Sequence, residues 1–308
     1  LARIDLTTGV FTEYNYSLGE SLNINLGLRA DYYNKTKQMN YLPRINVKYN
    51  TTDQTVFRLS AGRAFRVSNV FAENTSFLAS KRKIIMDDNL LPEIAWNYGI
   101  NLTHCFKLLG REGTMNLDYY KTVFENQVIV DVENQGELSF YNLKGNSFAS
   151  TIQLDLAYEI FTRFDIRMGY KINDVQSTFG NTQKTSPFKP NSRGLLNISY
   201  ATNFEKWKFD FTTNYIGKNR VPSNSLLNSH TQLSDDYLSD PFCIFNAQVT
   251  KSFRYIDIYF GGENLMEYLQ ENPIIAASNP DSEDFDASLI WAPVNGRMFY
   301  LGLRYKLK

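Results

Sequence analysis

Apolar and polar residues alternate with a period of two along much of the chain. The clearest segment spans residues 22–32, where every second residue is apolar or aromatic and the residues between are Asn23, Asn25, Gly27, Arg29 and Asp31. Because successive side chains of a β-strand point to opposite sides, this pattern predicts a strand with one apolar and one polar face. The same alternation recurs in segments 152–158, 164–172, 196–200, 207–215 and 299–307. No segment shows sustained helical periodicity, so the sequence predicts an all-β fold.

The predicted strands are joined by connections that alternate between short and long. Short turns are expected near residues 18–21, 50–53, 108–112, 159–162, 202–206 and 252–255. Long polar loops are expected near residues 66–91, 131–139, 174–191, 217–240 and 265–295. Short turns at one rim and long loops at the other are typical of outer-membrane β-barrels. The pattern gives about thirteen strands, each near the roughly 9–11 residues that a tilted strand needs to cross a bilayer.

The composition separates a membrane barrel from other classes with the same pattern. Mean hydropathy is −0.36 and no apolar run is long enough for a spanning helix, which excludes a helical membrane protein. Aromatic residues make up 15% of the chain, with 20 Tyr and 22 Phe, and Tyr in particular suits membrane–water interfaces. A soluble β-sandwich or jelly roll also alternates, but its polar face is more charged, whereas this one is rich in Asn, Thr, Ser and Gly. We therefore predict an antiparallel transmembrane β-barrel.

The charged, cysteine and histidine residues form no convincing catalytic arrangement. Lys+Arg and Asp+Glu both number 32, so the charge does not suggest a nucleic-acid partner. His104 lies on the apolar side of a predicted strand, as an interfacial ring near the short-turn rim, and His230 has no metal-binding neighbour. Cys105 and Cys243 are expected on opposite faces, lumen and lipid, as free thiols. We expect no enzyme activity, no metal site and no cofactor. One acidic loop is interpreted as solvated surface, with calcium binding as the alternative: Asp281, Glu283, Asp284 and Asp286.

Several segments resemble the C-terminal barrel of TonB-dependent outer-membrane receptors, particularly the Bacteroidetes type. They are FRLSAGRAFRVSNVFAEN (57–74), LLPEIAWNYGINL (90–102), NLDYYKTVFENQVIVD (116–131), GGENLMEY (261–268) and GRMFYLGLRYKLK (296–308). Barrels of this family have about twenty-two strands and are closed by an N-terminal plug. We therefore expect residues 1–308 to be the C-terminal portion of the barrel, with the plug and the first barrel strands absent. The alternative is a smaller barrel with an unrecognised strand.

The resemblance implies active uptake of a nutrient, such as a metal chelate, haem or cobalamin, across the bacterial outer membrane. The implied partners are a TonB-type energy-coupling protein of the inner membrane, a small nutrient ligand and the lipid bilayer. The alternative is a passive pore, or a barrel scaffold that holds a surface lipoprotein. Candidate ligand contacts, with interfacial anchoring as the alternative role, are Arg63, Arg66, Phe71, Phe77, Tyr237 and Trp291. Alternation places four arginines on the lumen-facing side: Arg29, Arg44, Arg58 and Arg167.

Overall fold

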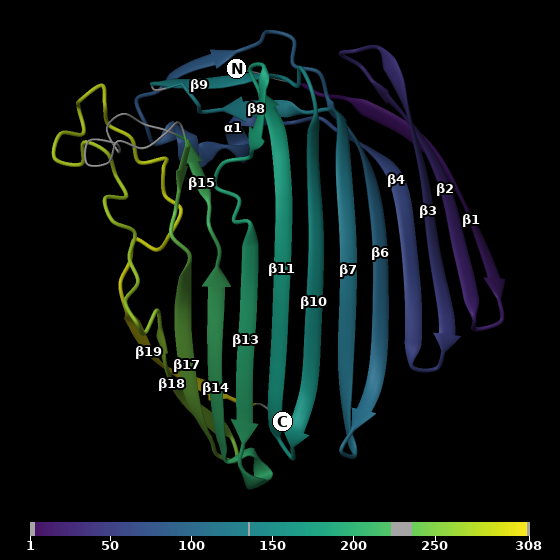
Figure 1. Cartoon of the computed structure of the whole chain (residues 1–308), viewed down its shortest axis with the longest axis vertical. Coiled ribbons are helices and arrows are strands. Elements are labelled where there is room, and N and C mark those ends of the chain that lie inside the picture. Colours follow the sequence, from purple (N-terminus) through teal and green to yellow (C-terminus); the bar gives the residue numbers. More distant parts are fainter. Residues whose placement is uncertain (1–3, 135, 223–235, 307–308) are drawn as a thin grey trace.

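The computed structural model describes residues 4–134, 136–222 and 236–306, which form a curved wall of long antiparallel strands (Figure 1). A 14-stranded sheet dominates this part of the chain, and β12 (Thr182–Thr185) pairs with one strand beside the main path. The main path runs through β1 (Thr7–Leu18), β2 (Leu22–Tyr33), β3 (Gln38–Thr52), β4 (Thr55–Arg66), β6 (Glu93–Leu108), β7 (Arg111–Asn126), β10 (Ser147–Phe161), β11 (Phe164–Phe179), β13 (Ser192–Ala201), β14 (Trp207–Ile216), β17 (Phe242–Ser252), β18 (Ile256–Glu263) and β19 (Met298–Tyr305). These strands confirm the predicted all-β architecture and its strand number.

Short elements occupy the long connections at one end of the wall (Figure 1). One small sheet joins β5 (Lys83–Met86), β9 (Glu137–Asn142) and β8 (Val128–Asp131), and another joins β15 (Arg220–Pro222) and β16 (Asp236–Leu238). The short helices are α1 (Val70–Glu73), η1 (Thr75–Leu78) and, in a turn at the opposite end, η2 (Asn203–Glu205). Alternation did not predict these strands because segments of three to six residues are too short to show it. None of the helices in the described residues is long and apolar enough to cross a membrane.

The short turns fall where the sequence predicts them. They cover residues 19–21, 53–54, 109–110, 162–163, 202–206 and 253–255. In the turn between β6 and β7, Leu109 and Gly110 have φ angles of 51° and 80°. Two positive φ angles match the right-handed twist of the flanking strands, and glycine supplies one of them without steric cost. A further short connection, 34–37, joins β2 to β3 at the loop end.

The strand register produces two chemically different faces. One face carries large apolar side chains that are about half exposed or more in the isolated chain, among them Leu28, Ile100, Ile172 and Leu301. A continuous apolar face of this extent far exceeds the patches that soluble monomers expose, and it fits contact with lipid. The opposite face carries amides, hydroxyls and charged groups. Its residues align across neighbouring strands, for example Asn25, Asn46, Ser60 and Gly99.

A compact apolar core lies in the loops. Val70, Val128, Val132, Leu138 and Phe140 are buried together there. They come from α1 and from the connection between β7 and β10, so the loops fold on one another. At roughly 25 cal/mol for each Å² of apolar surface removed from water, such burial makes a packed loop layer more stable than separate mobile loops.

Candidate functional site

Four arginines lie on the polar face of the sheet, where alternation places them: Arg29, Arg44, Arg58 and Arg167. Arg44 aligns with Gly27 on one side and Gly62 on the other. A Cβ atom at Gly27 would come within 2.6 Å of Arg44 Nε. The glycine therefore leaves room for the arginine side chain to lie across the neighbouring strand.

Ion pairs hold two of these arginines, Arg29 and Arg44, along the wall. Arg29 Nε donates to both carboxylate oxygens of the buried Asp31, at 2.7 and 2.9 Å. Arg44 pairs closely with Glu13 of β1. These contacts fix the positions of the charges on the polar face and provide donors along it.

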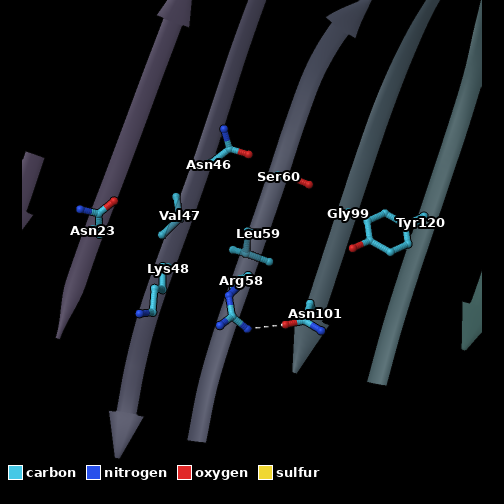
Figure 2. A pocket seen from close by; sticks show the side chains of 10 residues that line it. All are labelled: Asn23, Asn46, Val47, Lys48, Arg58, Leu59, Ser60, Gly99, Asn101 and Tyr120. Atoms are coloured by element: carbon cyan, nitrogen blue, oxygen red, sulfur yellow. Dashed lines mark hydrogen bonds between the residues drawn. The ribbon is translucent and has the colours of Figure 1, made fainter. Parts of the chain in front are cut away.

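A shallow hollow of about 450 Å³ lies on the same polar face (Figure 2). Arg58 Nη1 donates to Asn101 Oδ1 at 2.8 Å and to Thr103 Oγ1 at 3.1 Å. Figure 2 shows amide, hydroxyl and cationic side chains from neighbouring strands around this point, among them Asn23, Asn46, Lys48, Arg58, Ser60 and Asn101. Such a surface can hydrogen-bond a polar partner that fills the space in front of the sheet.

A second cavity, of about 500 Å³, lies among the loops. Its apolar walls include Phe77, Val128, Phe179, Phe188 and Ile290, and the Phe77 and Phe188 ring centroids are 6.1 Å apart. Its polar lining consists mainly of short side chains and one cation: Asn74, Ser177, Ser186, Ser288 and Lys189. Cavities of this size with apolar walls and a few polar groups are typical of small-molecule sites. We call it the loop cavity.

A buried ion pair ties together three of the segments around the loop cavity. Arg82, just before β5, donates through Nε to Asp286 Oδ2 at 2.9 Å, and both side chains are less than a tenth exposed. Arg82 Nη1 also reaches the carbonyl oxygen of Glu137 at 3.1 Å. Asp286 Oδ1 accepts from the backbone N–H and the hydroxyl of Ser288 at 2.8 and 2.6 Å. The expectation that the whole acidic loop is solvated is therefore wrong for Asp286, because its charge is compensated internally.

A second buried ion pair fastens the next two loops. Arg220 of β15 forms a bidentate contact with Glu133, with donor–acceptor distances of 2.9 and 2.6 Å. Lys184 of β12 approaches the same carboxylate at 3.4 Å. Sequence reasoning missed both ion pairs, because the partners lie 87 and 204 residues apart and no local pattern marks them.

Tyr141 of β9 links the loop core to the end of β11. Its hydroxyl donates to Asp131 Oδ2 at 2.6 Å and accepts from the backbone N–H of Gly180 at 3.0 Å. Burial, followed by the hydrogen bond to Asp131, raises the pKa of the Tyr141 phenol well above its ordinary value. The phenol therefore stays protonated and remains a donor at neutral pH.

Arg63 is held at the loop end of β4 on the face opposite Arg44. The register aligns it with Trp96, on the face that carries Leu59. Arg63 Nε and Nη2 donate to the carboxylate oxygens of Glu125 at 2.9 and 2.6 Å, and Trp96 Nε1 donates to the same carboxylate at 2.8 Å. This position favours interfacial anchoring over ligand contact. The ligand-binding role of Arg63 stays a prediction.

Arg66 and Phe71 lie near the loop core. The register places Arg66 opposite Glu93 on the polar face, and its Nη1 lies 3.0 Å from Glu73 Oε2. Phe71 packs edge-on against the buried Phe140, with ring centroids 6.0 Å apart. Phe71 therefore supports the loop core and is absent from the lining of the loop cavity.

The remaining candidates divide between the loop cavity and its surroundings. Phe77 lines the cavity. Trp291 packs against Phe242 with ring centroids 6.0 Å apart, and its backbone N–H donates to Gln270. Tyr237 belongs to β16, but its side chain lies outside the described residues, as does all of His230. Ligand contact by any of these residues stays a prediction.

The sequence analysis missed the cavity wall formed by residues 128–130. The signal that could have found it was the continuous apolar run from Val128 to Val130.

The positions of both cysteines and of His104 agree with the sequence analysis. Cys105 and Cys243 are free and lie on the polar and apolar faces respectively. His104 lies on the apolar face near the short turns, where its Nδ1 is 2.9 Å from the hydroxyl of Thr55. Among the described residues, no group of three or more His, Cys, Asp or Glu could hold a metal ion.

Comparisons with known proteins identify relatives of the chain. A family model described as "TonB dependent receptor-like, beta-barrel" matches residues 3–265. No curated protein matches the sequence significantly. The solved structure of the ferric enterobactin receptor PfeA from Pseudomonas aeruginosa matches with a TM-score of 0.66 at 14% identity, over 96% of this chain and 44% of that one. The FrpB iron transporter from Neisseria meningitidis matches with a TM-score of 0.66 at 14% identity, over 98% of this chain and 44% of that one. The siderophore receptor PirA from Acinetobacter baumannii matches with a TM-score of 0.66 at 14% identity, over 98% of this chain and 46% of that one.

The structural likeness at this identity concerns the fold alone. The chain spans less than half the length of these solved structures. The family model carries no distinction of a Bacteroidetes type, which stays a prediction.

Proposed function

Because the chain belongs to the TonB-dependent receptor β-barrel family, whose members are integral outer-membrane proteins, we propose that it forms part of a receptor for active nutrient uptake. The energy would come from a TonB-type protein of the inner membrane. We infer that residues 1–308 contribute the C-terminal portion of the barrel wall. The proposed substrate is a metal chelate or a similar small nutrient such as haem or cobalamin. Receptors of this family transport their ligands, and we propose no catalytic role.

The loop cavity is the observation that carries this proposal. Its volume of about 500 Å³ suits a small ligand. Phe77, Phe188 and Val128 can cover an apolar or aromatic ligand body. Lys189 and the serine hydroxyls can orient a ligand that carries oxygen atoms or a negative charge. A metal chelate combines both features. The similar structures are those of a ferric enterobactin receptor, an iron transporter and a siderophore receptor, which is consistent with this substrate class.

The polar face of the sheet supports the second half of the proposal. We infer that this face lines the lumen, with Arg29, Arg44, Arg58 and Arg167 among its charges. A wall of fixed amides and ion pairs can hydrogen-bond a plug in the closed state. The same groups can hydrate a path for the ligand when the plug moves.

Uptake by cells that carry the receptor in their own outer membrane tests the proposal. The cells would receive a labelled ferric chelate, haem and cobalamin in turn. We expect one probe to accumulate, and accumulation to stop when the proton gradient is collapsed. Accumulation that continues without the gradient would contradict active uptake and favour the passive pore. Recovery of a lipoprotein on the loops, with no accumulation of any probe, would favour the scaffold.

Substituting Phe77 tests the role of the loop cavity. Phe77→Ala removes one aromatic wall, and we expect an about tenfold higher KM for the accumulated probe, the equivalent of about 1.4 kcal/mol of lost contact. The matched control is Leu78→Ala, because Leu78 is the next residue, is exposed and does not line the cavity. An unchanged KM in Phe77→Ala, or an equal change in Leu78→Ala, would place the ligand elsewhere.

A further inference from the structure

Aromatic and cationic side chains gather at the short-turn end of β14 and β17. The register pairs Trp207, the first residue of β14, with Lys251 near the end of β17. Lys251 Nζ lies 4.3 Å from the centroid of the Trp207 ring and 5.8 Å from that of Phe253. The ring faces attract the ammonium group without neutralising its charge. Lys251 therefore keeps donors for a further partner.

Two more cations lie over aromatic rings in the adjoining turns. Lys206 Nζ is 5.9 Å from the centroid of the Phe204 ring, and the guanidinium carbon of Arg254 is 5.1 Å from that of the Tyr255 ring. All four aromatic side chains are exposed in the isolated chain, with Phe204 at 88%. The three cations and four rings, which we call the rim cluster, are Lys206, Lys251, Arg254, Phe204, Trp207, Phe253 and Tyr255.

The strands of the rim cluster place its central pair on the lipid-facing side of the wall. Trp207 alternates with Lys208 and shares its face with Phe209. Lys251 aligns with Ile258, which in turn aligns with Leu303 of β19. In outer-membrane barrels the short turns face the periplasm, and aromatic residues mark the boundary between acyl chains and headgroups. In a barrel oriented in this way, the ammonium of Lys251 would lie at headgroup height in the inner leaflet.

The carboxylates near this rim are paired with other lysines. Glu205 binds Lys208, and Asp257 binds Lys306, each with a nitrogen–oxygen distance of 2.6 Å. Lys208 and Asp257 belong to the polar face. The hydrogen bond from Lys208 lowers the pKa of Glu205, so this carboxylate stays charged and bound to that lysine. Within the described residues, no ion pair is found for Lys206, Lys251 or Arg254.

We propose that the rim cluster binds the phosphate group of an anionic phospholipid in the inner leaflet of the outer membrane. Lys206, Lys251 and Arg254 complement the negative headgroup, while Trp207 and Phe253 contact the upper part of the acyl chains. Basic side chains near a membrane surface attract anionic lipids in this way. The proposal rests on the barrel spanning the outer membrane and is independent of the transported nutrient.

Native mass spectrometry of the receptor extracted from its own outer membrane tests the site. The receptor in mild detergent would be titrated with phosphatidylglycerol, and with phosphatidylcholine as the zwitterionic comparison. We expect phosphatidylglycerol to bind more tightly, and Lys251→Gln to weaken it about fivefold, the effect of about one surface charge. Lys251→Arg should retain the affinity, because it keeps the charge over the ring. Inorganic phosphate should not compete, because it lacks the acyl chains.

The matched control is Lys107→Gln, which removes the same charge at the same rim but from the polar face, at the short-turn end of β6. We expect it to leave phosphatidylglycerol binding unchanged. Equal binding of the two lipids, unchanged affinity in Lys251→Gln, or an equal loss in Lys107→Gln would overturn the proposal. Folding of each variant is checked by the heat-dependent band shift of an intact barrel in gel electrophoresis. If Lys251→Gln fails to fold, the double variant Lys206→Gln/Arg254→Gln, whose positions lie in turns, carries the same test.

Discussion

Replacing Arg82 by alanine is expected to loosen the loop layer without unfolding the barrel wall. Arg82 joins its own loop to Asp286 in the connection between β18 and β19, and to the carbonyl of Glu137 in β9. The substitution leaves the buried carboxylate of Asp286 without its cation. It also leaves the carbonyl of Glu137 without this donor. Ser288 still donates to Asp286, so the carboxylate keeps part of its stabilisation.

The expected magnitude follows from the burial of both partners. Removing one member of a buried ion pair typically costs about 3–5 kcal/mol. When local opening limits amide exchange, a loss of 3 kcal/mol raises the exchange rate roughly 100-fold or more. The loss should concentrate in the three segments that Arg82 connects. The strands at the short-turn end share no contact with it.

Hydrogen-exchange mass spectrometry of the receptor in detergent provides the measurement. Peptides covering residues 80–92, 132–142 and 275–290 should exchange much faster in Arg82→Ala than in the unsubstituted protein. Peptides from β3 and β4 around the short turn at residues 53–54 should not change and serve as the internal reference. The assay resolves each loop separately, which a melting temperature does not.

Lys81→Ala is the matched control, because Lys81 is the next residue and reaches the same distant loop. Its ammonium lies 4.0 Å from an exposed carboxylate oxygen of Asp281. Exposed pairs contribute about 0–1 kcal/mol, so exchange should rise no more than about fivefold. Equal exchange rates in both variants would refute the claim that the buried Arg82–Asp286 ion pair stabilises the packing of the loops. Unchanged exchange near Asp286 in Arg82→Ala would refute it as well.

Two further predictions concern the other loop contacts. Arg220→Met should accelerate exchange around Glu133 by a similar factor, because among the described residues it leaves this mostly buried carboxylate with Lys184 as its one cation. Unchanged exchange around Glu133 would contradict this. The raised pKa of Tyr141 means that its stabilising bond to Asp131 is fully present below the ordinary tyrosine pKa near 10 and weakens only as the pH rises beyond it. Subtilisin cleavage of residues 127–146 should therefore increase between pH 9 and pH 11, and Tyr141→Phe should lack this increase above the background change in enzyme activity.

The strands were predictable because their information is local. In β10 and β11, alternation over residues 152–158 and 164–172 fixes which side chains share a face, and the register pairs Leu154 with Tyr170 as that requires. The face of Arg63 was predictable in the same way, because Arg63 follows Ala61 by two residues and Leu59 by four, and alternation puts all three on one face. The positive charge of Arg63 near a loop suggests ligand contact, but alternation along β4 places its side chain on the apolar face.

The loop layer was not predictable, because its contacts are not local. Leu138 belongs to a predicted polar loop, but the structure packs it with Phe140 against Val70 from another connection. Asp286 reads as one of several solvated acidic residues until Arg82 is found beside it. These contacts between distant loops depend on the register of all the strands between them. The alternation of apolar and polar residues within one strand carries no information about such contacts.

The long sequence separations within the loop layer determine when the loop cavity can form during folding. Each hairpin of the wall closes over a turn of a few residues, which is a small entropic step that an assembling chain can take early. The contact between Arg82 and Asp286 spans 204 residues and requires strands β4 to β18 to be in place first. The loop cavity is therefore completed late in biogenesis. A partly assembled wall would therefore present its hairpins without a closed loop cavity, and the proposed ligand site should exist only once the wall is complete.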